Sequence, residues 1–328
     1  MNLSEKDIEY ILKEWNVTPI EFKKAEKGNV NHNWIIKTKD AKYILRKVHN
    51  EYKQQDLEFE LNYLTYLKDC NFPYEIPFPI STTSKNSFIK TKKGYFYLYK
   101  FIEGNINENQ DEESLKQIAL MLSKYHEILK NSNFVNNKPQ IEDYNRKTLL
   151  KEFDEYEKGT EIKSEKKEIF LKELNKIIPI LEKLDTKIYN SLKKYPIHRD
   201  LNPENLIWRD NKLIGVIDFD NVSHTNDALI RDIAIIMQYF CSYKRKKLDL
   251  TKAKFFIEEY KKNSQLTKEE VSIIPDIITA TYIEDFGYTY WMLINDPKRA
   301  KLSRLRKYSN AAQWHFKNRN KIIGELTR

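Results

Sequence analysis

Three polar residues at a fixed spacing are the candidates for chemistry in this chain of 328 residues. Asp200 and Asn205 lie in the run His198-Arg-Asp-Leu-Asn-Pro-Glu-Asn205, which has the character of a short loop, and Asp218 ends the apolar run Leu213-Ile-Gly-Val-Ile. Phosphoryl transfer from ATP needs a carboxylate near the attacking hydroxyl and hard oxygen ligands that hold Mg²⁺ against the phosphates. We expect Asp200 to accept or orient the hydroxyl proton, and Asn205 and Asp218 to ligate Mg²⁺. The spacing therefore predicts phosphoryl transfer from Mg²⁺-bound ATP.

The other polar residues of these two runs have supporting or ambiguous roles. An aspartate in a loop often only caps backbone amides, but the fixed partners Asn205 and Asp218 favour the catalytic interpretation of Asp200. We expect His198 to brace the loop by hydrogen bonding rather than to transfer protons, and Arg199 not to be essential. Asp220 could ligate the metal or support the ligands from behind.

The N-terminal third predicts a small sheet with two helices. Apolar residues spaced as on a helix face run from Leu3 to Trp15, with Ser4 as the N-cap. A second helical stripe runs from Asp56 to Cys70. The remaining patterned segments read as short strands, at Ile20–Lys24, Trp34–Thr38, Lys42–Val48, Ser87–Lys90 and Tyr95–Phe101. We therefore expect an antiparallel-sheet lobe over residues 1–103.

From residue 104 onward the pattern changes to long helices, with the strands next to Asp218 as the exception. The charged stretch 158–167 is interpreted as a loop between helices, and no internal repeat is present. The predicted helices are Glu112–Leu129, Arg146–Glu157, Glu165–Leu192, Asp227–Phe240, Thr251–Lys262, Thr267–Leu293 and Leu302–Lys321. Residues 104–328 are thus expected to form a mainly helical lobe, so that the fold class is α+β with two lobes.

Composition excludes several other classes of protein. No run of eighteen apolar residues is present and the first residues are polar, so we expect a cytoplasmic protein without a membrane segment. Cys70 and Cys241 stand alone, without metal-ligand or disulfide spacing. The net charge of +9 comes from 57 basic residues interleaved with 48 acids. Such interleaving is typical of solvated helix faces, and nucleic acid is therefore not the expected partner.

The two runs resemble those of kinase-like phosphotransferases. Protein kinases share the loop H-R-D-x-x-x-x-N, but here Asp218-Phe-Asp220 replaces their D-F-G. The sequence is more similar to the aminoglycoside phosphotransferase and choline kinase superfamily, whose metal strand reads I-D-F or I-D-W. Ile217-Asp-Phe219, Asn226-Asp-Ala-Leu229 and Asp232-Ile-Ala-Ile235 look most like the type II homoserine kinases and their small-molecule kinase relatives. The resemblance implies the bilobal protein-kinase-like fold.

The resemblance also implies nucleotide-binding residues in the first lobe. Gly28 falls where the family has a turn over the ATP phosphates, and either Arg46 or Lys47, on opposite faces of one strand, would be the phosphate-binding cation. Glu60 would pair with that cation, although Glu58 competes for the role. The adenine would be held by backbone atoms of Tyr99–Ile102, which includes Lys100 and Ile102.

In the second lobe, the resemblance assigns Asp232 as the structural acid that holds the catalytic loop from below. The acceptor pocket would be walled by late helices, where Glu284 and Asp285 suit an ammonium group and Arg304 suits a carboxylate. Trp291 belongs to an aromatic stripe there, and such stripes are more often core than ligand cage.

These assignments favour an ATP-dependent kinase that phosphorylates a hydroxyl of a small metabolite, a homoserine-like amino acid or an amino alcohol. The alternatives are an aminoglycoside-type antibiotic kinase and a kinase-like protein without catalysis, such as a coat-associated binder. A protein kinase is disfavoured because the chain lacks A-P-E and G-x-G-x-x-G motifs. The oligomeric state is left open between monomer and homodimer.

Overall fold

The computed structural model describes residues 3–25, 32–49, 51–107, 111–134, 164–184, 187–298 and 300–328. These form two compact units. The first consists of residues 1–107 and 204–224, and the second of residues 108–203 and 225–328, as far as they are described. The lobe boundary predicted between residues 103 and 104 stays a prediction; the units group the segment 204–224 with the N-terminal residues.

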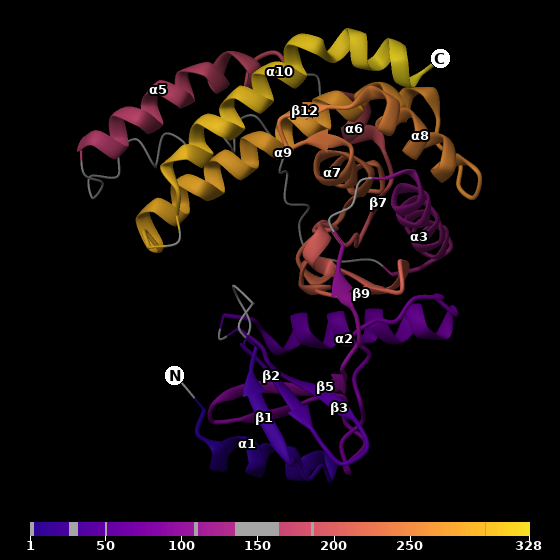
Figure 1. Cartoon of the computed structure of the whole chain (residues 1–328), viewed down its shortest axis with the longest axis vertical. Helices are drawn as coiled ribbons and strands as arrows, with labels where there is room; N and C mark the ends of the chain where they lie inside the picture. Colours follow the sequence, from indigo (N-terminus) through magenta and orange to yellow (C-terminus); the bar gives the residue numbers. More distant parts are fainter. Residues whose placement is uncertain are drawn as a thin grey trace. The chain divides into compact units, whose positions relative to one another are not determined.

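The first unit is built on an antiparallel sheet of five strands in the order β1-β2-β3-β5-β4. Its strands are β1 (Glu21–Lys24), β2 (His32–Lys37), β3 (Lys42–Lys47), β4 (Ile89–Thr91) and β5 (Gly94–Lys100). Helices α1 (Glu5–Leu12) and α2 (Gln54–Asp69) cover its opposite faces (Figure 1). This is the sheet lobe that the sequence predicts.

The core under α1 follows from the alternation of side chains along the strands. Helix α1 begins at the Ser4 N-cap, whose hydroxyl accepts from the Asp7 amide while the Asp7 carboxylate accepts from the Ser4 amide. Its apolar side chains, together with Trp15 in the 3₁₀ turn η1 (Lys13–Trp15), pack against every second residue of the central strands. The buried members from the strands are Trp34, Ile36, Leu45, Phe96 and Leu98. The side chains of Arg46 and Tyr97 lie on the other face of the sheet, towards α2.

A second, smaller sheet of the first unit carries the segment with Asn205 and Asp218. Its strands β6 (Asn105–Ile106), β8 (Leu206–Arg209) and β9 (Lys212–Val216) pair antiparallel in the order β6-β8-β9. Gly104 precedes β6 at a place where a Cβ atom would come within 2.5 Å of Ile207 Cγ2 and of the Trp208 carbonyl oxygen. Only glycine allows the chain to approach β8 this closely. The 3₁₀ turns η2 (Pro203–Asn205) and η3 (Asp220–Ser223) flank the hairpin.

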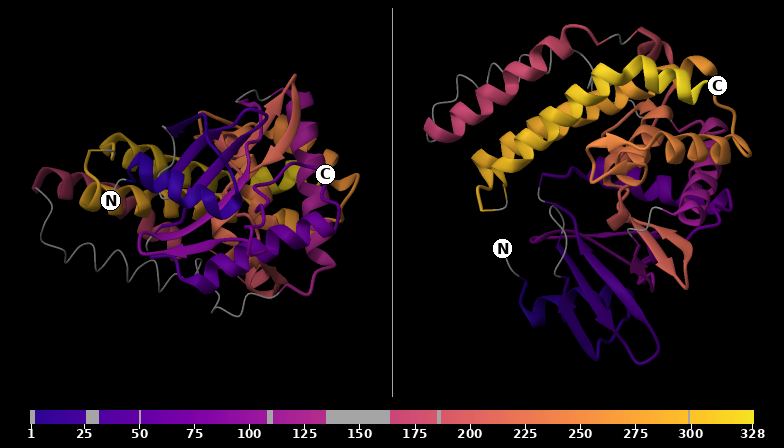
Figure 2. Two further views of the ribbon diagram at one scale, coloured as in Figure 1. Left: turned by 90° about the horizontal axis from the view of Figure 1, so that it is seen from below. Right: turned by 45° about the horizontal axis from the view of Figure 1, so that its top comes forward.

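The second unit is mainly helical. Two short strand pairs aside, it consists mainly of long helices, of which α5, α9 and α10 run side by side (Figures 1 and 2). Its helices are α3 (Glu112–Lys130), α5 (Ser164–Leu181), α6 (Lys187–Ser191), α7 (Ile230–Phe240), α8 (Leu250–Lys261), α9 (Lys268–Asn295) and α10 (Leu302–Leu326). The two-residue strands are β7 (Lys194–Tyr195) with β10 (Asp227–Ala228), and β11 (Ser242–Tyr243) with β12 (Lys247–Leu248). Helix α7 is almost entirely buried and packs on α9.

Two predicted helices differ from the structure. The single helix expected over Glu165–Leu192 is wrong, because α5 ends at Leu181 and α6 begins at Lys187. Pro179 lies inside α5 and removes one backbone donor in its last turn, which weakens the helix there. The helix expected from Asp227 begins only at Ile230, since Asp227 pairs with Tyr195 as a strand residue and its carboxylate accepts from the Ala228 amide. The helix predicted over 146–157 lies outside the described residues.

Across the described residues, no helix is long and apolar enough to cross a membrane.

Candidate active site

The β8–β9 hairpin places Asn205 and Asp218 at the same end of the small sheet. Asp210 and Asn211 form its two-residue turn with positive φ angles of 50° and 59°, a conformation that these two residue types tolerate in tight hairpins. The register pairs Leu206 with Val216. One residue further out, the Ile217 amide donates to the Asn205 carbonyl at 3.0 Å. The two predicted metal ligands therefore adjoin because the turn and the register shift between Ile207 and Trp208 together set the pairing at this end.

Asp218 and Asp220 meet the guanidinium of Arg46 from β3. Arg46 Nη2 lies 3.4 Å from Asp218 Oδ1 and also donates to Asp220 Oδ1. Burial alone would lower the pKa of Arg46, but the surrounding carboxylates of Asp220, Glu60 and Asp218 raise it well above its ordinary value. Arg46 is thus a fixed cation on the face of the sheet that α2 covers.

Glu60 reaches the same cluster from α2 and is buried. Its carboxylate accepts from the hydroxyls of Tyr97 and Tyr52, each at 3.2 Å. Burial raises the pKa of Glu60 to about 8; Asp220 and Asp218 add to the increase and Arg46 opposes it. Glu58, the competing candidate, is exposed and accepts from Gln54 within the same helix. The structure therefore brings Glu60, and not Glu58, to the buried side of α2.

The positions of the other predicted nucleotide-binding residues of the first unit neither support nor exclude their roles. Lys47 is buried, and strand alternation points it to the face opposite Arg46. Lys100 is exposed at the end of β5, and Ile102 is buried just beyond it. Gly28 lies outside the described residues. The choice between Arg46 and Lys47 as the phosphate-binding cation stays a prediction, but only Arg46 faces Asp218.

In the second unit, the predicted catalytic loop around Asp200 is held by short local hydrogen bonds. Asn202 Nδ2 donates to Asp200 Oδ1 at 2.8 Å, and the Asp200 amide donates to His198 Nδ1 at 3.3 Å. His198 is completely buried, whereas Asp200 is half-buried. Arg199, between them, has a φ angle of 63°, which is rare for a residue of this type. The loop therefore presents Asp200 at a defined orientation, with His198 as a buried brace.

Asp232 on α7 supports this loop from below. Its Oδ1 accepts from the Arg199 amide at 2.8 Å, and its Oδ2 lies 3.5 Å from His126 Nε2. The other ring nitrogen of His126, Nδ1, is 2.8 Å from the Tyr260 hydroxyl. Burial lowers the pKa of His126 and Asp232 opposes that change. The two interactions suit a neutral imidazole that joins α3, α7 and α8 beneath the loop.

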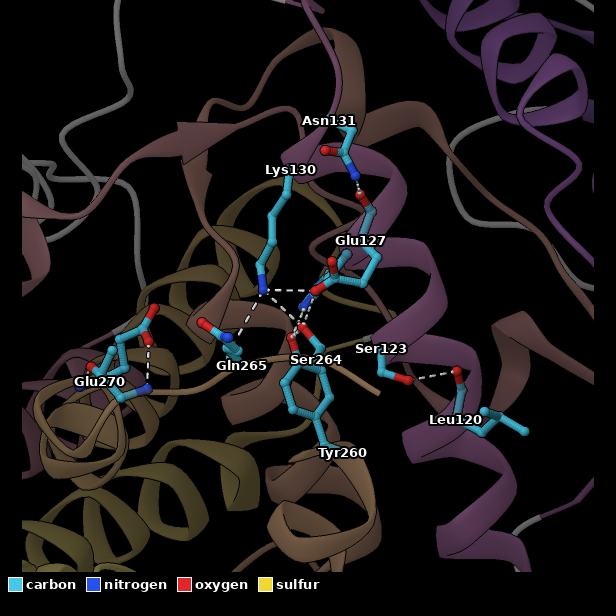
Figure 3. Close-up of polar contacts among 11 residues, drawn as sticks. Leu120, Ser123, Glu127, Lys130, Asn131, Tyr260, Ser264, Gln265 and Glu270 are labelled. Carbon is cyan, nitrogen blue, oxygen red and sulfur yellow. Dashed lines mark hydrogen bonds and ion pairs between the residues drawn. The ribbon is translucent and has the colours of Figure 1, made fainter. Parts of the chain in front are cut away.

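Beyond Tyr260 the polar contacts continue between α3 and the end of α8 (Figure 3). Ser264 lies 3.2 Å from the Tyr260 hydroxyl and donates to Glu127 Oε1 at 2.6 Å. Lys130 donates to the same Glu127 oxygen at 2.9 Å. These contacts fix Tyr260 and hence the ring of His126.

The two acids predicted for an ammonium group are already paired with arginines. Glu284 Oε2 accepts from Arg231 and lies 3.6 Å from Arg199 Nη2. Asp285 Oδ2 accepts from Arg245 at 2.6 Å. Glu284 Oε1, in contrast, is buried and has no hydrogen-bond partner among the described residues. One carboxylate oxygen of Glu284 therefore has no hydrogen-bond donor in the described part of the chain, although arginines surround the two acids.

The last two predicted acceptor residues lie on the surface of the second unit. Trp291 is 44% exposed and stacks on Tyr288, with ring centroids 5.8 Å apart. Arg304 is exposed in the first turn of α10. Their roles in acceptor binding stay predictions.

Sequence reasoning missed several residues that complete these clusters. Tyr52 has weak sequence signals because it lies in a short loop, yet its hydroxyl also contacts the Asp220 carbonyl at 3.0 Å and Ser223 Oγ at 2.6 Å. His126 sits on the apolar stripe of α3 and reads as core. Arg245 is part of a basic run that reads as a solvated loop. Residue spacing alone could not distinguish any of these residues from ordinary loop, core or surface residues.

The donor set at the hairpin suits Mg²⁺ bound together with phosphates. Among the described residues, no group of three or more His, Cys, Asp or Glu side chains could enclose a metal ion. Mg²⁺ in nucleotide sites commonly takes one or two protein oxygens and fills its remaining positions with phosphate oxygens and water. Asn205 and Asp218 adjoin at one hairpin end, and the Asp218 side chain keeps 46% of its surface exposed.

The chain matches a family model and curated proteins. Residues 21–262 match the model described as the phosphotransferase enzyme family. A homoserine kinase of Rhizobium etli is 23% identical over 311 residues, which cover 92% of this chain and 90% of that protein.

Solved structures of small-molecule kinases share the fold. An amicoumacin kinase in complex with AMP-PNP, Ca²⁺ and amicoumacin superposes with a TM-score of 0.69 at 13% identity, covering 96% of this chain and 94% of the other. A microcompartment-associated aminopropanol kinase superposes with a TM-score of 0.65 at 12% identity and covers 99% of both chains. The predicted protein-kinase-like α+β fold is therefore confirmed.

Proposed function

The chain belongs to the phosphotransferase enzyme family, and from this premise we propose that it transfers the γ-phosphoryl group of ATP to a hydroxyl of a small metabolite. One observation carries the proposal. The β8–β9 hairpin sets Asn205 beside Ile217 and Asp218, which supplies an amide and a carboxylate for Mg²⁺ at one point. The complex of the amicoumacin kinase with AMP-PNP and Ca²⁺ supports a nucleotide as the phosphoryl donor.

Each residue of the two units has a separate role in this proposal. Asp200 accepts or orients the proton of the attacking hydroxyl, with its carboxylate held by Asn202. Asn205 and Asp218 would hold Mg²⁺, which would supply positive charge to the transferred phosphoryl group. Arg46 contributes a positive charge to the phosphates, and Asp218 and Asp220 keep its side chain in place. Asp232 positions the loop through the Arg199 amide.

We favour a homoserine-like amino acid or an amino alcohol as the acceptor. The Glu284 carboxylate, whose side chain is 24% exposed, can accept from one ammonium group. A polycationic aminoglycoside is disfavoured, because Arg199, Arg231 and Arg245 already offset the charges of Glu284 and Asp285. The homoserine kinase and aminopropanol kinase relatives agree with a small amino-bearing acceptor.

The test is a screen of ATP consumption with Mg²⁺ against homoserine, choline, ethanolamine, aminopropanol, simple sugars and aminoglycosides, with the product identified by mass spectrometry. We expect one small amino-bearing alcohol to stand out. Turnover of an aminoglycoside alone would shift the proposal to an antibiotic kinase. Failure of every acceptor to be phosphorylated, at protein concentrations that detect one turnover, would remove the proposal.

The Asp200→Asn variant sharpens the test. Loss of the proton-accepting carboxylate should lower kcat by roughly 100-fold or more while ATP binding stays unchanged, because the residue acts mainly in the transition state. Glu204→Gln is the matched control: it removes one negative charge from an exposed position of the same loop and should keep full turnover. Equal activity of Asp200→Asn and the wild type would contradict the assigned role.

A further inference from the structure

A basic pocket of the second unit has no role in the function proposed above. Its volume is about 470 Å³, a size typical of small-molecule sites. Four cations, Lys246, Lys247, Arg306 and Lys307, share its lining with the polar Ser303 and Asn310 and with apolar residues of α5 and α10. No carboxylate belongs to this lining in the described part of the chain.

The β11–β12 hairpin holds two of these cations in place. Its turn residues Lys244 and Arg245 have φ angles of 49° and 54°, which neither residue type favours. Arg245 secures the turn, since it pairs with Asp285 at 2.6 Å and lies 4.0 Å from the centre of the Tyr239 ring. Lys246 and Lys247 follow directly and line the pocket. The charge of Arg245 is balanced by Asp285, whereas no ion pair is seen for these two lysines among the described residues.

The other two cations come from the first turns of α10. Lys307 is half-buried, and its burial lowers its pKa; Arg245, Arg304 and Lys246 lower the pKa further, while Asp285 opposes them. Arg306 is exposed and only 3.7 Å from Glu173 Oε1. Helix α10 begins without a side-chain cap, so the positive end of its dipole adds to the potential near Ser303.

An ordinary solvated helix face explains exposed lysines, but it does not explain this arrangement. Here the cations surround a hollow whose remaining walls, Ile169, Leu302 and Trp314, are apolar and partly buried. Like charges crowded around a hollow of low polarity repel one another unless an anion lies between them. An apolar wall opposite the cations suits the carbon skeleton of a small organic ligand.

We propose that this pocket binds a small organic anion with at least two negative charges, such as a phosphate monoester or a dicarboxylate, whose carbon skeleton packs against Trp314 and Ile169. Glu173 already pairs with Arg306, and a single carboxylate would leave two of the other three cations unbalanced. The amino-bearing acceptor favoured above does not carry two negative charges, so this anion is either a regulator or a phosphate acceptor of another class. The choice between regulator and acceptor rests on the proposed function, whereas binding of the anion does not.

Binding is measured by calorimetry at low salt with glycerol 3-phosphate and malate as probes and glycerol as the uncharged counterpart. We expect at least one dianion to bind the wild type with Kd below about 10 mM and to weaken as salt increases. The charge reversal Lys246→Glu with Lys307→Glu should weaken binding about tenfold or more. Lys317→Glu with Lys321→Glu, two exposed positions of α10 outside the pocket, makes the same change in net charge and should alter Kd by less than about twofold.

Because the charge-reversal variants could lose binding by failing to fold, a second variant blocks the pocket without changing its charge. Asn310→Trp fills the pocket from an exposed position and should abolish binding while circular dichroism and Tm stay unchanged. The proposal is overturned if neither dianion binds more tightly than glycerol, or if the Lys317 and Lys321 variant loses as much affinity as the Lys246 and Lys307 variant.

The two sources of the anion are separated by ³¹P NMR with ATP and Mg²⁺. Conversion of the bound dianion to a phosphorylated product identifies it as the acceptor. A dianion that binds, is not consumed and changes kcat or KM with another acceptor identifies a regulatory site.

Discussion

The Glu60 carboxyl makes the stability of the nucleotide-free protein depend on pH in an unusual direction. One guanidinium, that of Arg46, faces three carboxyl groups, those of Glu60, Asp218 and Asp220. Glu60 is 1% exposed, whereas the side chains of Asp218 and Asp220 are 46% and 22% exposed and contact Arg46 directly. Ionisation is therefore most costly at Glu60, and its pKa is raised from 4.5 to about 8.

The sign of the effect follows from proton linkage. Below pH 4.5, Glu60 is protonated in both the folded and the unfolded chain. Between pH 4.5 and 8 only the folded chain keeps the proton, so the free energy of unfolding falls as pH rises, by about 1.4 kcal/mol per pH unit. Over the whole window this amounts to about 5 kcal/mol, an upper value because water and Arg46 soften the charge.

The Glu60→Gln variant removes this dependence. Its amide oxygen can still accept from Tyr97 or Tyr52, and it carries no charge at any pH. We expect near wild-type stability at pH 5 and greater stability than the wild type at pH 8. Glu58→Gln, an exposed position of the same helix, is the control and should follow the wild type at every pH.

The assay is urea unfolding between pH 5 and 8 in EDTA, followed by circular dichroism and by tryptophan fluorescence. Trp15 and Trp34 are buried in the first unit and report on its unfolding. Parallel curves of unfolding free energy against pH for Glu60→Gln and the wild type would refute the reasoning. So would a wild type that gains stability relative to the variant as pH increases.

Two further predictions concern the metal and the loop support. Asp218→Asn should raise the Mg²⁺ concentration for half-maximal activity at least tenfold, read from initial rates in a Mg²⁺ titration, whereas a shift below twofold would argue against metal ligation. His126→Gln should change the pH dependence of stability: the folded-state pKa of His126 lies below its ordinary 6.5, so wild-type stability falls as pH drops below 6.5, and the variant should lose that component in urea unfolding. Equal slopes for variant and wild type would contradict a buried neutral His126.

Helix positions and the paired motif could be predicted from the sequence because both depend on local patterns. Helix α9 is apolar over many consecutive residues and α10 carries an apolar stripe, and the predicted helices Thr267–Leu293 and Leu302–Lys321 agree with them within a few residues. The two-residue strands β7 and β10 were missed, since a pattern of period two needs more residues than these strands contain.

The partners within the candidate site could not be predicted, because they are set by tertiary packing. Residue spacing left Arg46 and Lys47 equivalent, and only the side of the sheet that each one faces separates them. Asp220 was ambiguous in sequence, and its contact with Arg46 depends on β9 ending where it does. The arginines beside Glu284 and Asp285 lie more than thirty residues away along the chain, too far for any local pattern to reveal.

Positive φ angles occur both in the Asp200 loop and beside the basic pocket. Apart from asparagine and aspartate, which tolerate positive φ angles, the described non-glycine residues in that region are Lys85, Arg199, Lys244 and Arg245. Lys85 lies in an exposed turn where its amide bonds to Thr82. The other three cost on the order of 1–3 kcal/mol each and persist only where surrounding contacts enforce them. At Arg199 that contact is Asp232, next to Asp200, the proposed base; at Arg245 it is Asp285, beside the pocket cations. The strain at Arg199 is thus held beside Asp200, whereas the positive φ angles of Lys244 and Arg245 are those that a tight β-hairpin turn requires.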